Sequence, residues 1–189
     1  FLGAFGLIDS FKLNIDCNHA TLATHTWEHD LLTASIAGRL GSLDINRGDP
    51  NLGWDTDQFP ADLHAATLAM LVILNQGGLG KGGLNFDAKV RRGSFDSVDL
   101  FHALIGGMDT FARALLVADA IIRDGVFSKV LEERYRGFRE TEMGRKILAR
   151  KTTLPELDAW ADSVGEPERV SARQEALENV LNDYLYGRL

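Results

Sequence analysis

The chain is poor in cysteine and has no long apolar run, and both absences exclude whole classes of protein. Cys17 is the single cysteine among 189 residues, so no disulfide framework can form within the chain. No stretch approaches the roughly 20 apolar residues that a membrane-spanning helix needs. The first residues, FLGAFGLIDS, lack Met and do not have the pattern of a signal peptide. We therefore expect a piece of a longer globular protein of the cytoplasm.

Positive charge is also scarce. The chain carries 20 Lys and Arg against 27 Asp and Glu, for a formal net charge of -7 and a pI near 5.2. Because such a chain is not attracted to nucleic-acid backbones or anionic membranes, neither is an expected partner.

Motifs of several enzyme classes are missing as well: there is no GxGxxG turn after a strand, no P-loop and no GxSxG elbow.

What the chain does have is a repeated pairing of Asn and Asp two residues apart. The pairs are Asn14/Asp16 in KLNID, Asp44/Asn46 in SLDIN and Asn85/Asp87 in GLNFD. In a strand, residues two apart point to the same face, so each segment would direct a carboxylate and an amide to one side. Buried carboxylates carry a desolvation penalty that a cation relieves. A divalent-metal site is therefore our first hypothesis.

Strands and helices alternate through the first two thirds of the chain. Predicted strands cover residues 12–16, 42–46 and 82–87, and predicted helices cover 26–40, 61–75 and 98–124. This alternation is typical of a parallel sheet with helices outside it. Functional groups in such sheets gather at the carboxyl ends of the strands, where Asp16, Asp44 and Asp87 are expected.

Beyond Gly125 the pattern changes to charged helical segments separated by Gly and Pro. We expect a strand-and-helix domain over residues 1–125 and a helical extension over 126–189, which would pack on its own domain or on a neighbouring subunit. The last segment has an apolar stripe of Leu177, Val180, Leu181, Tyr184 and Leu185. The stripe expected for the long helix before it is Leu100, Leu104, Phe111, Leu115, Ala118 and Ile122.

Three further residues extend the candidate ligand set. His19 lies just past the first strand, and Asp55 and Asp57 lie in GWDTDQF after the second. With the strand-end acids they make five carboxylates and one imidazole, a set that suits hard cations such as Mg²⁺ or Mn²⁺ rather than structural zinc. Two ions fit better than one, because five acids around a single ion leave excess negative charge. Asn14 and Asn46 would orient the carboxylates as hydrogen-bond donors.

Simpler roles compete with metal binding. A single Asp at a strand end is most often a helix N-cap or a turn former, and the segment 55–57 could be an Asx turn. Trp54 either lines a pocket or packs. Structural roles are expected for Cys17 in the core, for His25, His29, His64 and His102 at helix starts or on helix surfaces, and for Lys89, Arg91 and Arg92 as partners of acids.

Four segments together resemble the C-terminal half of xylose isomerase: LNIDCNHATLATH, GSLDINRGDPNLGWDTDQFP, GGLNFDAKVRR and GMDTFARAL. The resemblance extends over essentially the whole chain. It implies an α/β fold, the C-terminal part of a (β/α)8 TIM barrel with about three βα units, followed by an extended helical tail. In that family the tail embraces a neighbouring subunit, commonly within a homotetramer.

The resemblance also implies an activity. It is the interconversion of D-xylose and D-xylulose, and of D-glucose and D-fructose, by a 1,2-hydride shift assisted by two divalent cations, Mg²⁺, Mn²⁺ or Co²⁺. The implied ligands are Asp16 between the two ions, Asp44 and Asp87 on the first ion, and His19, Asp55 and Asp57 on the second. The family's other catalytic residues lie in its first half and have no counterpart in this chain, which implies a partial enzyme.

One departure from the family stands at the bridging position, where Asp16 replaces the usual Glu and shortens the reach by about 1.5 Å. Two alternatives remain beside the isomerase. The chain could be a non-catalytic metal-binding or assembly fragment. It could also belong to another metal-dependent barrel enzyme, such as a phosphodiester-cleaving one, which would need more His ligands and a basic groove.

Overall fold

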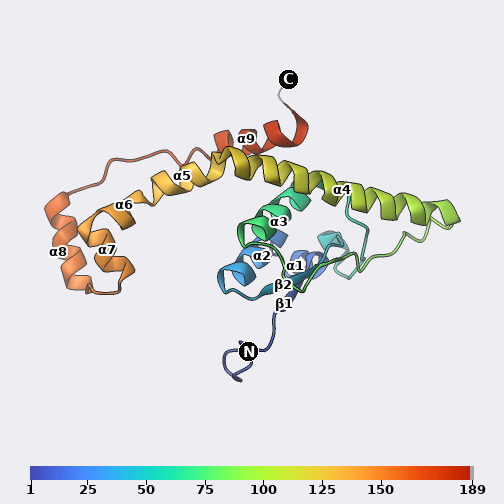
Figure 1. Ribbon diagram of the computed structural model, residues 1–189, viewed down its shortest axis with the longest axis horizontal. Helices are drawn as coiled ribbons and strands as arrows, with labels where there is room; N and C mark the ends of the chain where they lie inside the picture. The colour runs from blue at the N-terminus through green and yellow to red at the C-terminus, as the bar shows by residue number, and fades with distance from the viewer. Residues whose placement is uncertain (188–189) are drawn as a thin grey trace. The chain divides into compact units, whose positions relative to one another are not determined.

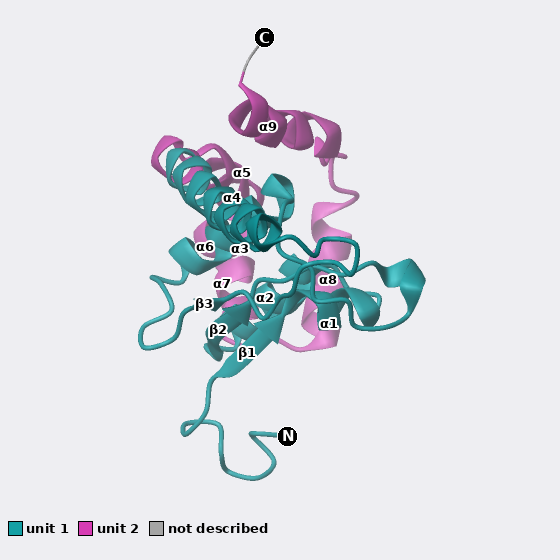
Figure 2. Ribbon diagram, turned by 90° about the vertical axis from the view of Figure 1, so that its right-hand side faces the viewer, with its two compact units in different colours: residues 1–120 teal, residues 121–189 magenta. Residues whose placement is uncertain are grey.

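The computed structural model describes residues 1–187, and the chain divides into two compact units, Phe1–Ala120 and Ile121–Leu189 (Figures 1 and 2). The first unit contains a small sheet of three strands in the order β1-β2-β3, with both neighbouring pairs parallel. The strands are β1 (Leu13–Asp16), β2 (Leu40–Asp44) and β3 (Leu84–Asn85). A parallel sheet joined through helices is the α/β arrangement that the alternation predicts.

Helices make up most of the chain. In the first unit they are α1 (Cys17–Leu22), α2 (Trp27–Ile36), the short 3-10 helix η1 (Pro50–Leu52), α3 (Leu63–Asn75) and most of α4 (Ser97–Asp124). The second unit contains the end of α4, α5 (Val126–Arg134), α6 (Arg136–Glu140), α7 (Glu142–Leu148), α8 (Leu154–Val164) and α9 (Gln174–Tyr186). Among the described residues, no helix combines the length and the apolar character needed to cross a membrane.

The register of the sheet brings the strand ends side by side. Asp16 of β1 pairs with Asp44 of β2, and Asp44 pairs with Asn85 of β3. All three strands run in one direction, so their carboxyl ends meet at one edge. The predicted third strand is too long, since β3 covers only two residues and Asp87 lies two residues beyond it.

Three other parts of the predicted layout are wrong. The strand predicted over 42–46 is β2, which covers residues 40–44 and leaves Asn46 beyond its end. The helix predicted over 26–40 ends at Ile36, because Gly38 takes a left-handed backbone at φ 66° and Leu40 already belongs to β2. The stretch after β1, which none of the predicted strands or helices covers, forms the short helix α1. Its N-cap is Asp16, whose side chain accepts a hydrogen bond from the His19 backbone N–H and starts the helix directly at the strand end.

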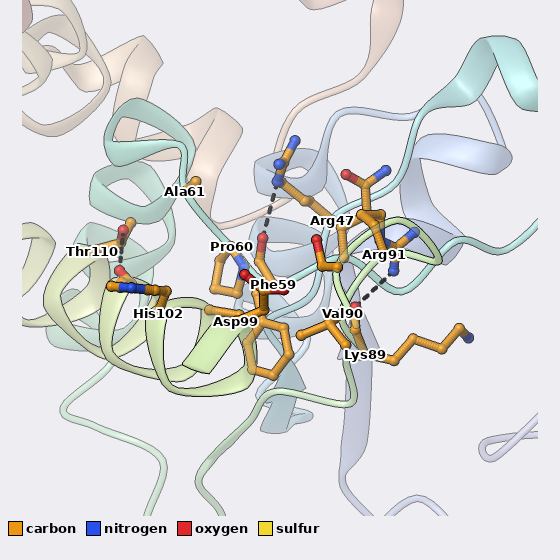
Figure 3. Close-up of a pocket in the computed structure, with 15 residues that line it drawn as sticks. Arg47, Phe59, Pro60, Ala61, Lys89, Val90, Arg91, Asp99, His102 and Thr110 are labelled. Atoms are coloured by element: carbon orange, nitrogen blue, oxygen red, sulfur yellow. Dashed lines mark hydrogen bonds between the residues drawn. The ribbon is translucent and has the colours of Figure 1, made fainter. Parts of the chain in front are cut away.

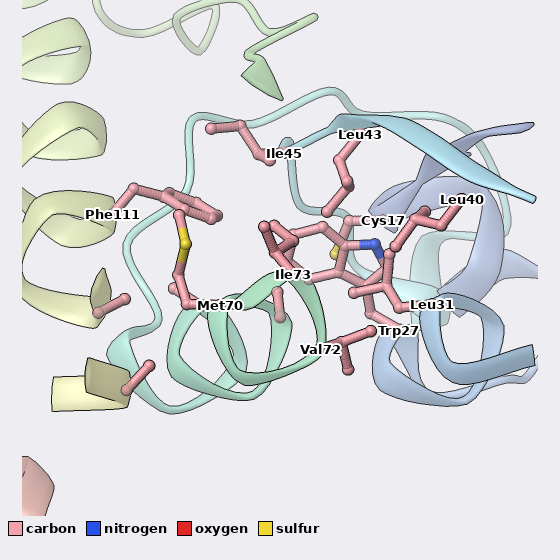
Figure 4. Close-up of a cluster of buried hydrophobic side chains, with 14 of the residues drawn as sticks. Cys17, Trp27, Leu31, Leu40, Leu43, Ile45, Met70, Val72, Ile73 and Phe111 are labelled. Carbon is pink, nitrogen blue, oxygen red and sulfur yellow. The ribbon is translucent and has the colours of Figure 1, made fainter. Parts of the chain in front are cut away.

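The apolar core of the first unit lies between the sheet and helices α1 to α4 (Figure 4). Cys17 is buried there, as predicted. The Trp27 and Phe111 rings meet edge to face with centroids 6.3 Å apart, a favourable aromatic geometry. Leu31 and Leu43 are fully buried in the same cluster.

The stripe predicted for α4 is displaced around the helix. Phe111 and Ala118 are buried as predicted, but Ala114 and Ile121 complete the buried line, while Leu100, Leu104, Leu115 and Ile122 are exposed. The spacing of 111, 114, 118 and 121 keeps one helical face. The prediction followed the large apolar residues, which lie on the adjacent face of the helix. The small alanines lie on the buried face, where the helix packs closely against neighbouring elements.

In the second unit the stripe predicted for the last helix is confirmed: Leu181 and Leu185 of α9 are buried, and Leu177, Val180 and Tyr184 are partly buried. The Tyr184 hydroxyl donates to the Asp124 carboxylate over 2.5 Å and ties α9 to the end of α4. Exposed ion pairs such as Glu142 with Lys146, at 2.9 Å, account for some of the charge of the intervening helices.

Candidate metal centre

The structure brings three strand-end acids together. Asp16, Asp44 and Asp87 each offer a carboxylate oxygen, and these atoms all lie within 4.8 Å of one another. They come from the ends of three neighbouring strands, which the parallel pairing sets side by side. Carboxylates this close repel one another unless a cation lies between them. Their oxygen donors match the preference of hard divalent cations, so the residues present fit such an ion.

Asparagine amides hold Asp44 in place. The Asn14 amide donates to one carboxylate oxygen of Asp44 over 2.6 Å, and the Asn85 amide donates to the other over 2.9 Å. Both donors lie on strands that pair with β2, one on each side. The Asp44 carboxylate is thereby fixed with a free lone-pair direction on each oxygen. Asn85 is a partner that the sequence analysis did not assign.

Asp16 serves two purposes. One oxygen accepts from the His19 backbone N–H over 2.8 Å as the cap of α1, and the other accepts from the Asn46 amide over 3.1 Å. The helix-cap alternative is therefore correct for this residue, and the same carboxylate also belongs to the strand-end group. Because it caps α1, the Asp16 side chain is directed toward the start of that helix. This direction limits how far the carboxylate, one methylene shorter than that of Glu, extends toward an ion.

Two of the acids have an unusual backbone. Asp57 and Asp87 have φ of 42° and 40°, in the left-handed region that few residues other than Gly adopt. Asp tolerates this region better than most side chains, but the conformation still has a cost. Such conformations concentrate at functional sites. The Asn46 amide also donates to the Asp87 carbonyl over 3.3 Å and supports this turn.

His19, Asp55 and Asp57 form a second, looser group. The His19 Nε2 lies 2.9 Å from an Asp55 carboxylate oxygen, but the three residues do not gather three ligand atoms within 4.8 Å, as the strand-end acids do. The hydrogen bond to Asp55 and then the charge of Asp16 raise the pKa of His19. Its hydrogen bond with Asp57 raises the pKa of Asp55, whereas Asp55 and Lys89 lower the pKa of Asp57.

Asn18 is a site residue that the sequence analysis missed. It is fully buried, its backbone N–H donates to the Asn46 side-chain oxygen over 3.0 Å, and its amide donates to the Asp55 carboxylate. Its own side-chain oxygen is buried without a partner in the structure. Gly48 makes room for it, since a Cβ on Gly48 would lie 1.5 Å from that oxygen. Only its place between Asp16 and His19 hints at this role.

Asn46 and Asn18 thus connect the two groups. Asn46 bonds Asp16 with its amide and Asn18 with its oxygen, and Asn18 in turn holds Asp55. Both asparagines are buried, so water does not compete for the hydrogen bond between them, whereas their bonds to Asp16 and Asp55 are partly buried. A continuous chain of hydrogen bonds therefore joins the two groups.

Basic residues fix the loop that carries Asp55 and Asp57. Lys89 forms an ion pair with Asp57 at 2.7 Å, as predicted. Arg91 instead donates to backbone carbonyls of this region, including that of Asp57 at 2.9 Å and that of Lys89 at 2.8 Å, the latter drawn in Figure 3. Its expected pairing with acids is therefore wrong. Trp54 is exposed and does not pack in the core.

A hollow lies beside this loop. It is lined by Phe59, Pro60 and Val90 together with Asp99 and His102 of α4 (Figure 3). None of the six predicted metal ligands lines it. The chemistry of the site therefore belongs to the strand ends and not to this hollow.

Comparisons with known proteins agree with the segments that carry the resemblance. A family model described as the XylA2 C-terminal domain matches residues 131–185. The chain is 56% identical, over 185 residues, to xylose isomerases of a Bacillus species and of Geobacillus stearothermophilus, and 55% identical to xylose isomerase 1 of Xanthomonas campestris pv. campestris. These matches cover 98% of this chain and 41 or 42% of each relative.

The chain therefore spans about two fifths of the length of the curated relatives that it matches. The aligned part includes nearly every residue of this chain, and so it includes the strand ends and the helices after residue 130. With identity of this level over almost the whole chain, the chain belongs to the xylose isomerase family and corresponds to the C-terminal part of its members.

Proposed function

We propose that this chain supplies most of the metal ligands of an aldose-ketose isomerase that interconverts D-xylose and D-xylulose, and also D-glucose and D-fructose. The observation that carries the proposal is the convergence of Asp16, Asp44 and Asp87 within 4.8 Å at adjoining parallel strand ends. The relatives are named xylose isomerases, which supports a sugar substrate.

The proposed centre holds two divalent cations, Mg²⁺ or alternatively Mn²⁺ or Co²⁺. Asp16, Asp44 and Asp87 would hold the first, while His19, Asp55 and Asp57 would hold the second, with Asp16 shared. When bound, the ions supply Lewis-acid polarisation of the sugar oxygens for a hydride shift between C1 and C2.

The remaining work of the chain is positioning. Asn14 and Asn85 keep both Asp44 oxygens oriented, and Asn46 aligns Asp16. Lys89 balances the charge of Asp57 and draws its carboxylate to one side. A rigid ligand set lowers the reorganisation that ion binding requires, which favours a precise metal position.

The architecture belongs to the same proposal. Residues 1–125 would form the last part of a (β/α)8 barrel, because parallel strands with acids at their carboxyl ends are the arrangement of barrel active sites. Residues 126–189 would form the helical extension that contacts a neighbouring subunit of a homotetramer. Several exposed apolar side chains on α5 and α8, including Leu131, Leu154 and Trp160, support such a contact.

The test uses the complete gene product that contains these residues. We expect His19→Ala and Asp57→Asn each to weaken binding of the second ion, and to reduce xylose turnover about 100-fold or more, because each removes a direct ligand. Isothermal titration with Mg²⁺ measures the first effect and a coupled xylulose assay the second. Circular dichroism checks that the fold persists.

The matched control is His64→Ala, at an exposed position on α3. It should bind Mg²⁺ and turn over xylose like the unmodified protein. Wild-type turnover by His19→Ala would overturn the ligand assignment. Two bound ions with no xylose turnover in the unmodified protein would instead favour the non-catalytic metal-binding fragment.

A further inference from the structure

A second cluster of metal-ligating side chains lies at the start of α2, in the first unit. His25, His29 and Asp30 each offer a ligand atom, and the three atoms lie within 4.8 Å of one another. The His25 Nδ1 is 2.9 Å from one Asp30 carboxylate oxygen, and the His29 Nδ1 is 2.8 Å from the same oxygen. The two imidazole rings have centroids 4.9 Å apart.

The donor set differs from that of the strand-end acids. Two imidazoles and one carboxylate are the ligands of borderline divalent cations such as Zn²⁺, whereas Mg²⁺ prefers oxygen alone. Three protein ligands leave at least one position of a tetrahedral ion for water. We propose that His25, His29 and Asp30 form a separate binding site for Zn²⁺ or a similar transition-metal ion.

The geometry needs only a small adjustment. A tetrahedral Zn²⁺ with bonds of about 2.0–2.1 Å sets its ligand atoms roughly 3.3 Å apart. The two separations between an Nδ1 and the Asp30 oxygen, 2.9 and 2.8 Å, are shorter by about 0.5 Å or less, and all three ligand atoms lie within 4.8 Å of one another, so both rings have to move outward around the ion. The side chains have room to do this, since His25 and His29 are 48% and 60% exposed.

Proton placement also permits ligation. Each Nδ1 faces a carboxylate oxygen, which accepts a hydrogen bond from it. Binding an ion requires the hydrogen on Nδ1 to leave, and an imidazole can instead carry its hydrogen on Nε2. Asp30, 27% exposed, would keep its charge and offset part of the charge of the ion.

The ion would strengthen the beginning of α2. Thr26, its N-cap, makes no side-chain hydrogen bond to the helix, so the first backbone N–H groups of α2 have no side-chain cap. A metal that joins His25, before the helix, to His29 and Asp30, inside it, would tie the entering chain to the first turns. Because the folded state alone presents this geometry, binding would stabilise it by mass action.

The experiment is a Zn²⁺ titration of the complete gene product by calorimetry, with excess Mg²⁺ present to occupy the strand-end acids. We expect one additional Zn²⁺ per chain in the unmodified protein compared with the variant His25→Ala/His29→Ala. Asp30→Asn should weaken this binding at least about tenfold, because even an outer partner of a ligand costs about 10- to 100-fold when it is lost.

Zinc X-ray absorption supplies an independent readout. Two imidazoles per ion are expected at this site, against one at most from His19. His64→Ala is the matched control and should bind zinc like the unmodified protein. If the double variant fails to fold, His29→Gln replaces it and should show the same loss. Equal zinc stoichiometry and affinity in the unmodified protein and in the folded variant would overturn the proposal.

Discussion

At the scale of single residues, amides decide where the acids point. Asp44 is held by two asparagines from the neighbouring strands, and Asp16 is held by Asn46 and by the helix that it caps. A carboxylate with fixed hydrogen-bond partners can direct its remaining lone pairs at a cation, whereas an unrestrained one would first have to be ordered. The asparagines therefore orient the acids of the site.

The Asn46 side chain should couple the two proposed ion positions. Asn46→Leu keeps the approximate volume but leaves the Asp16 oxygen and the Asn18 N–H without their buried partner. We expect Mg²⁺ affinity to fall about 10- to 100-fold at both positions, measured by calorimetry on the complete gene product. The exposed Asn51→Ala is the control. Unchanged Mg²⁺ affinity in Asn46→Leu would mean that the hydrogen bonds of Asn46 do not influence ion binding.

The protonation of His19 should depend on Asp55. In metal-free protein the raised pKa means that protonated His19 stabilises the folded state fully below its ordinary pKa of about 6.5. This contribution is lost as the pH rises through the folded-state value, and ions that need the neutral ring bind more weakly below that value.

An NMR titration of the imidazole protons measures this pKa. Asp55→Asn removes the charged partner and should lower the pKa of His19 toward its ordinary value. If the His19 pKa is the same in the metal-free unmodified protein and in the metal-free Asp55→Asn variant, the hydrogen bond between the two side chains does not raise the pKa of His19.

At the scale of elements, caps and close approaches set the boundaries that place the site. Asp16 turns strand β1 directly into helix α1, and this puts Asn18 and His19 beside the strand ends. Gly82, just before β3, lies directly against Gly41 of β2. A Cβ on Gly82 would lie 1.7 Å from the Gly41 carbonyl oxygen, so the absence of a side chain allows this close approach. Short elements with such fixed junctions carry the ligands more precisely than long loops would.

Helix α3 offers a test of capping. The Asp62 carboxylate accepts hydrogen bonds from the His64 and Ala65 backbone N–H groups, at 2.9 and 3.3 Å. Asp62→Ala should lower the free energy of unfolding by about 1 kcal/mol in chemical denaturation, because two helix donors lose their partner. Asp62→Asn, which can cap equally well, should change stability little. Equal losses in both variants would mean that charge, not capping, matters.

At the scale of the whole molecule, the chain leaves much apolar surface without cover. Phe1 and Phe95 are 85% and 86% exposed, and within residues 1–187 the sheet ends at β1 on one side and β3 on the other. Uncovered sheet edges and large apolar patches are sites of association. The match to about two fifths of each relative is consistent with surfaces that the rest of a family member would cover.

Produced alone, the 189-residue chain should therefore bind a hydrophobic dye strongly and turn over no xylose. Joined to the remainder of a family member, the same residues should lose most of the dye binding and support turnover, because the proposed barrel would then pair the open edges. Dye fluorescence and the xylulose assay measure both properties. Weak dye binding by the chain alone would mean that its two units cover their own apolar surfaces.

The sequence by itself determined the α/β class, the parallel strands and the convergence of three acids, because side-chain alternation and strand order are local patterns with one common geometric outcome. It also carried the family resemblance. Only the tertiary structure decided that Asp16 caps α1, that buried Asn18 joins the two ligand groups, and that Ala114 and Ile121 complete the buried line of α4. The cap is a local contact across three residues, and the sequence left it open as one of two roles for a strand-end Asp. The other two features depend on contacts between residues distant in the chain, and no local pattern encodes the space that a residue such as Gly48 leaves open.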